Sequence, residues 1–319
     1  MVKQNLQGFR LNYFALTIFI SSFLLFLIQP LIGKQILPQF GGTSAVWTTC
    51  LLFFQFMLVT GYLYAHLLSK LQLKMQIHIH TILIVSVLGM MMALYGIWDT
   101  PITPGHGIIK TLSGSPVVKI LMLLMLAIGL PFFILSTTST LIQSWFGHTF
   151  PHISPYSLYA LSNTASFLAL VSYPVFFEPL IPLRGQAMIW FGTFILFSII
   201  IFLAMIRTIK NATGTTDYED IESEDQYKIQ PSDSRTIRPG LVTVFYWISI
   251  SATSSLMLLA TTNKITLDIA PVPFLWILPL ALYLLSFVMA FANLLNRYRK
   301  LWTGLFIAAM FAAWLNLQL

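Results

Sequence analysis

Charged side chains are scarce in this sequence of 319 residues: Asp, Glu, Lys and Arg together make up 8%, whereas hydrophobic residues make up 57%. A soluble globular domain carries roughly a quarter charged residues. So few charges cannot form a water-exposed shell, so most of the surface must face lipid. The mean hydropathy of +0.82 agrees with this. The composition therefore excludes an ordinary soluble enzyme and predicts an integral membrane protein.

The motifs of several enzyme classes are also missing. No Gly-x-Ser-x-Gly, Cys-x-x-Cys or Gly-x-Gly-x-x-Gly occurs, so the sequence offers no nucleophile elbow, dithiol or nucleotide loop. The single cysteine, Cys50, cannot form an internal disulfide. His78 and His80 are two residues apart on a predicted helix, so they face different directions and do not form a zinc site. We therefore expect no metal, no cofactor and no catalytic residues.

Long apolar runs dominate what is present. Each is long enough to cross a hydrocarbon core of about 30 Å as a helix, and none shows the alternation of a barrel strand. Only helices and closed barrels satisfy the backbone in lipid, so the runs predict an all-α, polytopic helical bundle. We expect about nine spans, at residues 11–32, 45–68, 77–98, 117–145, 156–177, 186–206, 241–262, 271–292 and 301–319.

The net charge of +7 follows the loops between these runs. If the N-terminus is in the cytoplasm, five of the 17 Lys and Arg residues lie on the opposite side of the membrane and the other 12 lie on the cytoplasmic side. This bias predicts a cytoplasmic N-terminus by the positive-inside rule, and it argues against nucleic-acid binding. The five are Lys34, Lys110, Lys119, Arg184 and Lys264.

A polar segment divides the chain. Residues 207–239 contain seven of the ten acids of the sequence and few apolar residues, so we expect a disordered cytoplasmic linker. It separates a first six-helix bundle, residues 1–206, from a partial second bundle of three helices, residues 240–319. This 6 + 3 plan is similar to that of major facilitator (MFS) transporters, with an incomplete second half.

Ionisable side chains at the ends of the spans are candidate functional groups, because charge at bilayer depth is costly unless it is paired or hydrated. Glu178 closes the fifth span, and two interpretations stay open. It either forms an interfacial ion pair with Arg184 or provides a cavity carboxylate for a cation or a proton. Asp268 is expected to pair with Lys264 and anchor a loop.

Helix breaks and small polar residues mark further positions. In the first span, Pro30 and Gly33 are expected to break the helix, and Ser44 is expected to cap the next one. The fourth span contains the hydroxyl run 136–140, and the fifth contains Ser157, Ser162 and neighbouring polar residues. These residues predict either close helix packing or a hydrated path between the two spans.

Several ordered stretches resemble the membrane half of bacterial fused MFS transporter/spermidine synthase-like proteins. They cover most of residues 11–292, and the main ones are Leu24–Lys34, Gly61–His66, Ser157–Asn163, Tyr173–Pro179, Ala260–Asn263 and Pro273–Leu284. The resemblance implies a multi-pass protein of the bacterial cytoplasmic membrane. In that family an aminopropyltransferase-like domain follows the membrane region. No residues here match that domain, so no synthase activity carries over.

Three hypotheses follow. The first is a transporter-like protein with a polyamine-type cationic substrate, whose cavity contains Glu178, Asn163, Gln29 and Asn263. The second is a membrane anchor or scaffold for a separately encoded spermidine synthase-like enzyme, which would then be a partner besides the lipid bilayer. The third, an integral membrane enzyme, requires convergent ionisable residues that the sequence does not offer.

Overall fold

The computed structural model describes residues 2–98, 100–102, 113–149, 156–214, 240–268, 273–291 and 299–316. Every regular element in these ranges is a helix, as the sequence predicts. The elements are α1 (Val2–Phe40), α2 (Ser44–Leu68), α3 (Leu73–Trp98), α5 (Pro116–Leu124), the π-helix η1 (Met125–Gly129), α6 (Leu130–Thr149), α7 (Tyr156–Ser172), the π-helix η2 (Tyr173–Phe177), α8 (Glu178–Leu180), α9 (Leu183–Gly214), α10 (Leu241–Asp268), α11 (Pro273–Phe291) and α12 (Arg299–Asn316).

Seven helices in the described ranges are long and apolar enough to cross a bilayer. They match the first seven predicted spans, mostly within a few residues at each end. The remaining two predicted spans coincide with α11 and α12, whose described apolar stretches are shorter, Ile277–Phe291 and Lys300–Ala309. The structure therefore confirms an all-helical fold of the described residues, with seven helices that could cross a membrane, while the number nine and the 6 + 3 plan stay predictions.

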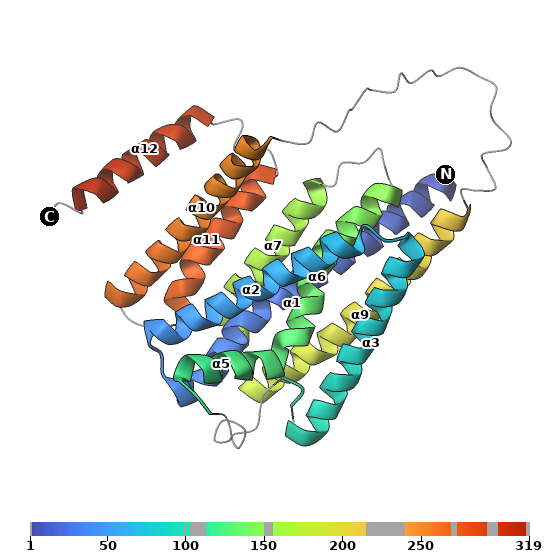
Figure 1. Cartoon of the computed structure of the whole chain (residues 1–319), viewed down its shortest axis with the longest axis horizontal. Helices are drawn as coiled ribbons and strands as arrows, with labels where there is room; N and C mark the ends of the chain where they lie inside the picture. Colours follow the sequence, from blue (N-terminus) through green and yellow to red (C-terminus); the bar gives the residue numbers. More distant parts are fainter. Residues whose placement is uncertain are drawn as a thin grey trace.

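Successive long helices run in alternating directions, so the bundle has two ends (Figure 1). We call the end where α1 begins the near end, and the end where α1 stops and α2 starts the far end. The turn between α2 and α3 lies at the near end, and the turn before α9 lies at the far end. α5 lies across the far end, and the chain bends at η1 into α6 (Figure 1). A π-helical insertion is a common cause of such a bend.

α1 forms the centre of the bundle. Its most apolar window is 67% buried, against 28% for α3 and 0% for α10. α1 packs most extensively against α7 and α9, and α7 in turn packs against α11. On α9, Trp190 is fully buried and donates its indole N–H to the carbonyl of Leu24 at 3.0 Å, which joins α9 to α1. α12 lies to one side of α10 and α11 (Figure 1).

The expected break in the first span does not occur. α1 continues through Pro30 and Pro38 to Phe40. Each proline removes one backbone hydrogen bond of α1, and this loss is tolerated because neighbouring helices enclose this part of the chain. Gly33 instead permits close packing, since a Cβ there would lie 2.7 Å from Cζ3 of Trp47. The chain then turns at Gly41, whose φ of +76° favours glycine.

The next helix begins one residue earlier than expected. Thr43, not Ser44, occupies the N-cap position of α2, and Ser44 is the first helical residue. Such boundaries shift by a residue between criteria. The Ser44 hydroxyl is engaged elsewhere, in a hydrogen bond to a side chain of α10 that is described below.

The predicted linker also starts too early, since α9 continues to Gly214. The acidic run of the linker lies outside the described residues.

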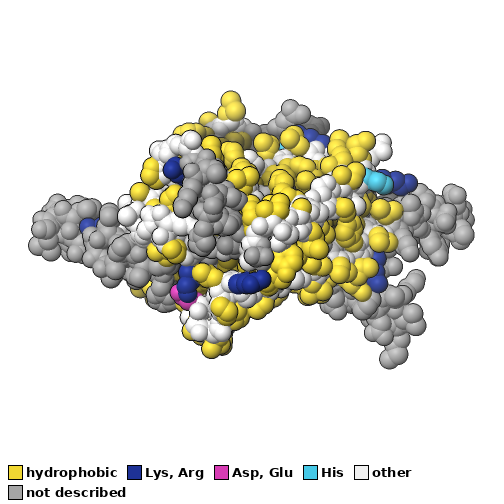
Figure 2. Space-filling model, turned by 90° about the horizontal axis from the view of Figure 1, so that it is seen from below, with side chains coloured by type: hydrophobic (Ala, Val, Ile, Leu, Met, Phe, Trp, Pro, Cys, Tyr) yellow, Lys and Arg dark blue, Asp and Glu magenta, His cyan; other side chains and the backbone are white. Residues whose placement is uncertain are grey.

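On the face that Figure 2 shows, hydrophobic side chains cover much of the described surface, and cations appear at scattered points. Large apolar side chains such as Leu52, Ile82 and Phe245 are more than half exposed. A soluble monomer rarely exposes contiguous apolar patches above a few hundred Å². This surface is therefore suited to lipid, as the composition predicts.

Candidate functional site

An ion pair at the far end is the most distinctive charged feature of the described structure. The Lys34 ammonium on α1 lies 3.0 Å from Oε1 of Glu178, the first residue of α8. Both side chains are partly exposed, 33% for Lys34 and 42% for Glu178. The pair therefore joins the end of α1 to the end of the fifth span, within reach of water.

The expected partner of Glu178 was Arg184, and this expectation is corrected. Glu178 and Arg184 lie close in sequence but on either side of the break at Ile181 and Pro182, and no ion pair between them is found among the described residues. The fifth span packs along α1, which brings Lys34 to Glu178 instead. Because this contact depends on how two distant helices are rotated, no local sequence signal reveals it.

Buried polar groups surround the segment that carries Glu178. The Nε2 group of Gln186 on α9 donates to the carbonyls of Phe177 and Ile181 at 3.0 and 2.7 Å, one on each side of Glu178. The Oε1 atom of Gln186 and the hydroxyl of Tyr173 are buried without a hydrogen-bond partner among the described residues. Tyr173 begins η2, and π-helical turns often occur at functional sites.

The four predicted cavity residues do not come together. Gln29 is buried within α1 and makes only a long contact, 3.5 Å, to the carbonyl of Leu25. Asn163 donates to the carbonyl of Tyr159 at 2.8 Å, and it lies 15 residues before Glu178, about 22 Å along the helix. Asn163 therefore belongs to a different region from Glu178, whereas Gln29 lies five residues before Lys34 on α1.

Asn263 does lie at the far end. Its Oδ1 atom accepts a 2.6 Å hydrogen bond from the Ser44 hydroxyl, which connects α2 to α10. This bond links the first six spans to the helices that follow the linker. The predicted pair of Lys264 with Asp268 stays a prediction, because the side chain of Asp268 lies outside the described residues. Asp99 also lies outside them.

The small polar residues of the fourth and fifth spans mainly mediate helix packing. Ser136 donates to the carbonyl of Phe133 on its own helix at 2.7 Å, and its side chain fills the space above Gly61 of α2. Between α1 and α7, the hydroxyls of Ser22 and Ser162 are 2.8 Å apart. These contacts support the packing interpretation over the hydrated path.

A buried polar cluster near the other end was not predicted. On α3, His80 is fully buried and contacts Tyr64 of α2, with 3.5 Å between Nδ1 and the phenol oxygen. One turn earlier, Gln76 accepts a 2.8 Å hydrogen bond from the indole of Trp145 on α6. His78 is exposed, so the two histidines do face different directions. In the described residues, no three His, Cys, Asp or Glu side chains are grouped as a metal site would require.

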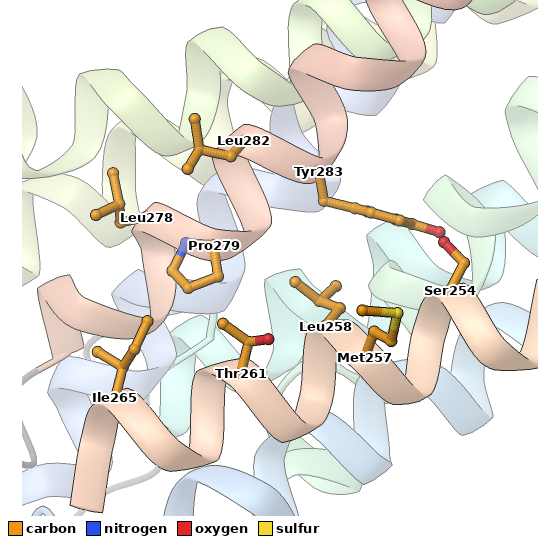
Figure 3. Close-up of a pocket in the computed structure, with 9 residues that line it drawn as sticks. All are labelled: Ser254, Met257, Leu258, Thr261, Ile265, Leu278, Pro279, Leu282 and Tyr283. Atoms are coloured by element: carbon orange, nitrogen blue, oxygen red, sulfur yellow. The ribbon is translucent and has the colours of Figure 1, made fainter. Parts of the chain in front are cut away.

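A groove of about 430 Å³ lies between α10 and α11 (Figure 3). Ser254, Leu258 and Thr261 line it from α10, and Pro279, Leu282 and Tyr283 line it from α11. Tyr283 extends its ring across the gap toward Ser254 (Figure 3). Its volume is within the range typical of small-molecule sites. The apolar runs that contain these residues gave no reason to select them.

Comparison of the chain with protein-family models, with curated proteins and with solved structures found no match. The resemblance carried by the sequence motifs therefore stays a prediction. The site is characterised by its geometry: an exposed ion pair and a hydrogen bond that join helices at the far end, and a mostly apolar groove beside them.

Proposed function

We propose that this chain is a transporter-like protein of the cytoplasmic membrane, similar to the membrane half of the fused MFS transporter/spermidine synthase-like proteins. It carries a polyamine-type cation, has no synthase activity of its own, spans the membrane nine times and keeps its N-terminus in the cytoplasm. The Lys34–Glu178 pair is the observation that most supports cation transport.

The pair supports this function through its exposure and its position. A carboxylate at the end of a span needs a cationic partner, and Lys34 provides it in this structure. Because both groups are partly exposed, a substrate ammonium can replace that of Lys34 without leaving Glu178 unpaired. Exchange of one ammonium for another avoids the cost of an uncompensated carboxylate.

The far-end contacts also suit alternating access, in which two halves of a bundle rock against each other. The Lys34–Glu178 pair closes α1 against α8, and the Ser44–Asn263 bond closes α2 against α10. We propose that both contacts open when the far end opens. The ion pair then acts as a closure that a cationic substrate weakens.

Uptake of labelled spermidine into proteoliposomes tests the proposal. We expect Glu178→Gln to reduce uptake at least about tenfold, equivalent to roughly 1.4 kcal/mol. Arg184→Gln is the matched control, because it removes a neighbouring far-end charge that is not paired with Glu178, and it should retain uptake. Equal uptake by Glu178→Gln and the parent would remove Glu178 from the mechanism, and no uptake by the parent would remove the function.

A second candidate is the anchor or scaffold for a separate spermidine synthase-like enzyme. The favouring observation is α10, whose most apolar window has no buried residue and whose outer face is open to a partner. A neighbouring reading frame that encodes an enzyme with a Gly-x-Gly nucleotide loop would favour this candidate. Co-purification of the two proteins in a 1:1 ratio would support it, and their separation on gel filtration would count against it.

A further inference from the structure

The helical turn just before Glu178 is wider than a turn of α-helix. In η2 the N–H of Glu178 donates to the carbonyl of Tyr173, five residues earlier, whereas an α-helix joins residues four apart. The wider turn therefore contains one extra residue. Because one residue corresponds to about 100° of rotation around an α-helix, η2 determines the direction in which the Glu178 side chain points.

Pro174 is the second residue of η2. In an α-helix its ring would clash with the carbonyl of Leu170, four residues earlier, and its missing N–H would leave that carbonyl without a donor. Leu170 is fully buried, so bulk water does not supply one. Membrane helices accommodate proline through hydroxyl side chains and local π-helical turns. Both are present here, because the Ser172 hydroxyl donates to the carbonyl of Ala169 at 3.1 Å next to the π-helical turn.

The chain is held on both sides of this turn. Tyr173, the first residue of η2, is buried in the bundle. At the other end, the Gln186 amide on α9 donates to the carbonyl of Phe177 at 3.0 Å. Between these two points Val175 and Phe176 are 54% and 58% exposed. The extra residue therefore widens the helix on the side that faces away from the bundle core.

Other prolines show that a wider turn is not a general consequence of proline in this bundle. Pro30 of α1 and Pro279 of α11 both lie inside regular α-helices. Pro174 differs from them in its place, since it lies four residues before Glu178, whose carboxylate is 3.0 Å from the Lys34 ammonium. The wider turn therefore occurs where a rotation of the helix changes the only ion pair found among the described residues.

We propose that Pro174 is a positioning residue of the cation site. It maintains the extra residue in η2, and the extra residue directs the Glu178 carboxylate toward Lys34. In a regular α-helix Glu178 would be rotated by about 100°, and the ion pair would be lost. The consequence for transport rests on the proposed function, whereas the positioning itself concerns only the geometry of the Lys34–Glu178 pair.

Zero-length cross-linking of the full chain in detergent micelles tests the inference. A water-soluble carbodiimide joins a lysine amine to a carboxylate that it contacts, with loss of water, and mass spectrometry of the digested protein detects the Lys34–Glu178 amide. We expect this cross-link in the parent and not in Glu178→Gln. Pro174→Ala keeps the number of residues but permits an α-helix, so the yield should fall at least about tenfold as Glu178 turns away by about 100°.

Deletion of Pro174 gives a sharper comparison, because it removes the extra residue together with the proline. Glu178 then follows Tyr173 by four residues of α-helix, so it points nearly as it does after η2. The deletion should therefore retain the cross-link that the substitution loses. Deletion of Leu168, from the regular part of α7, is the matched control and should lose it, because the residues beyond turn by about 100°. Pro279→Ala, the same substitution in α11, should leave the yield unchanged.

Equal yields in the parent and in Pro174→Ala would overturn the inference. If Pro174→Ala does not fold, the two deletions decide, since equal yields after deletion of Pro174 and of Leu168 would exclude a special role of η2. Spermidine uptake separates the inference from the proposed function. Pro174→Ala should reduce uptake, and adding Glu178→Gln should reduce it no further. The expected cross-links without uptake by the parent would refute transport alone, and parental uptake with unchanged cross-linking in Pro174→Ala would refute the role of Pro174 alone.

Discussion

A substitution at Gly61 tests how closely α2 and α6 approach each other. Gly61 is buried on α2 and faces Ser136 of α6, and an added Cβ would lie 2.9 Å from the Ser136 Cβ and closer still to its hydroxyl oxygen. Real Cβ atoms essentially never approach another heavy atom this closely. Gly61→Ala must therefore separate the helices or displace Ser136. Overpacking of this kind costs roughly 1–3 kcal/mol.

Gly89→Ala is the control, because a Cβ at Gly89 of α3 meets no heavy atom within 4 Å. Both substitutions gain the same helix propensity, about 1 kcal/mol, so the difference between them isolates the packing cost. We expect Gly61→Ala to unfold about 1–3 kcal/mol more easily than Gly89→Ala. The assay is titration of the protein in mild detergent micelles with sodium dodecyl sulfate, followed by tryptophan fluorescence.

A double-mutant cycle makes the prediction specific to the contact. Ser136→Gly removes the atoms that Gly61→Ala would meet, so the cost of Gly61→Ala should largely disappear in that background. Equal unfolding midpoints for Gly61→Ala and Gly89→Ala would refute the close approach. So would a cost of Gly61→Ala that persists unchanged in the Ser136→Gly background.

Two further substitutions test other contacts by the same titration. Gly33→Ala should destabilise the protein by about 1–3 kcal/mol, because the added Cβ would meet the Trp47 ring. Gly192→Ala is the control and should not destabilise it, because a Cβ at Gly192 meets no heavy atom within 4 Å. Equal unfolding midpoints for the two variants would contradict the packing of Gly33 against Trp47. Trp145→Phe should lower the free energy of unfolding by about 1–3 kcal/mol, because it leaves the buried Gln76 oxygen without its donor. The loss should be smaller in a Gln76→Leu background. An equal loss with and without Gln76→Leu would disprove the hydrogen bond.

The helices could be predicted from the sequence because their cause is local. A run of about 20 apolar residues has to be helical in lipid, whatever surrounds it. The seven long spans therefore match their predicted positions. The ends were less certain, and α1 continues through Pro30 and Pro38 because neighbouring helices, not the local sequence, decide whether a proline ends a membrane helix.

The site could be predicted only in part, because its contacts depend on helix rotation. Glu178 was identified from its rarity, yet its partner Lys34 lies 144 positions earlier in the chain (178 − 34) and follows from the packing of the fifth span along α1. Asn263 was identified as polar, but its bond to Ser44 depends on how α10 meets α2. Tyr283 is one of several aromatic residues in an apolar run, and only the structure distinguishes it by placing it across a groove.

The central claim is that the chain crosses the bilayer with its helices in alternating directions, and accessibility labelling tests it most directly. Because Cys50 is the only cysteine, Cys50→Ser gives a background without thiols. Lys70→Cys then reports on the near end between α2 and α3, and Pro182→Cys reports on the far end before α9. In intact bacterial cells, we expect an impermeant maleimide to label Pro182→Cys at once and Lys70→Cys only after permeabilisation. Labelling of both positions from the same side of the membrane would contradict the account.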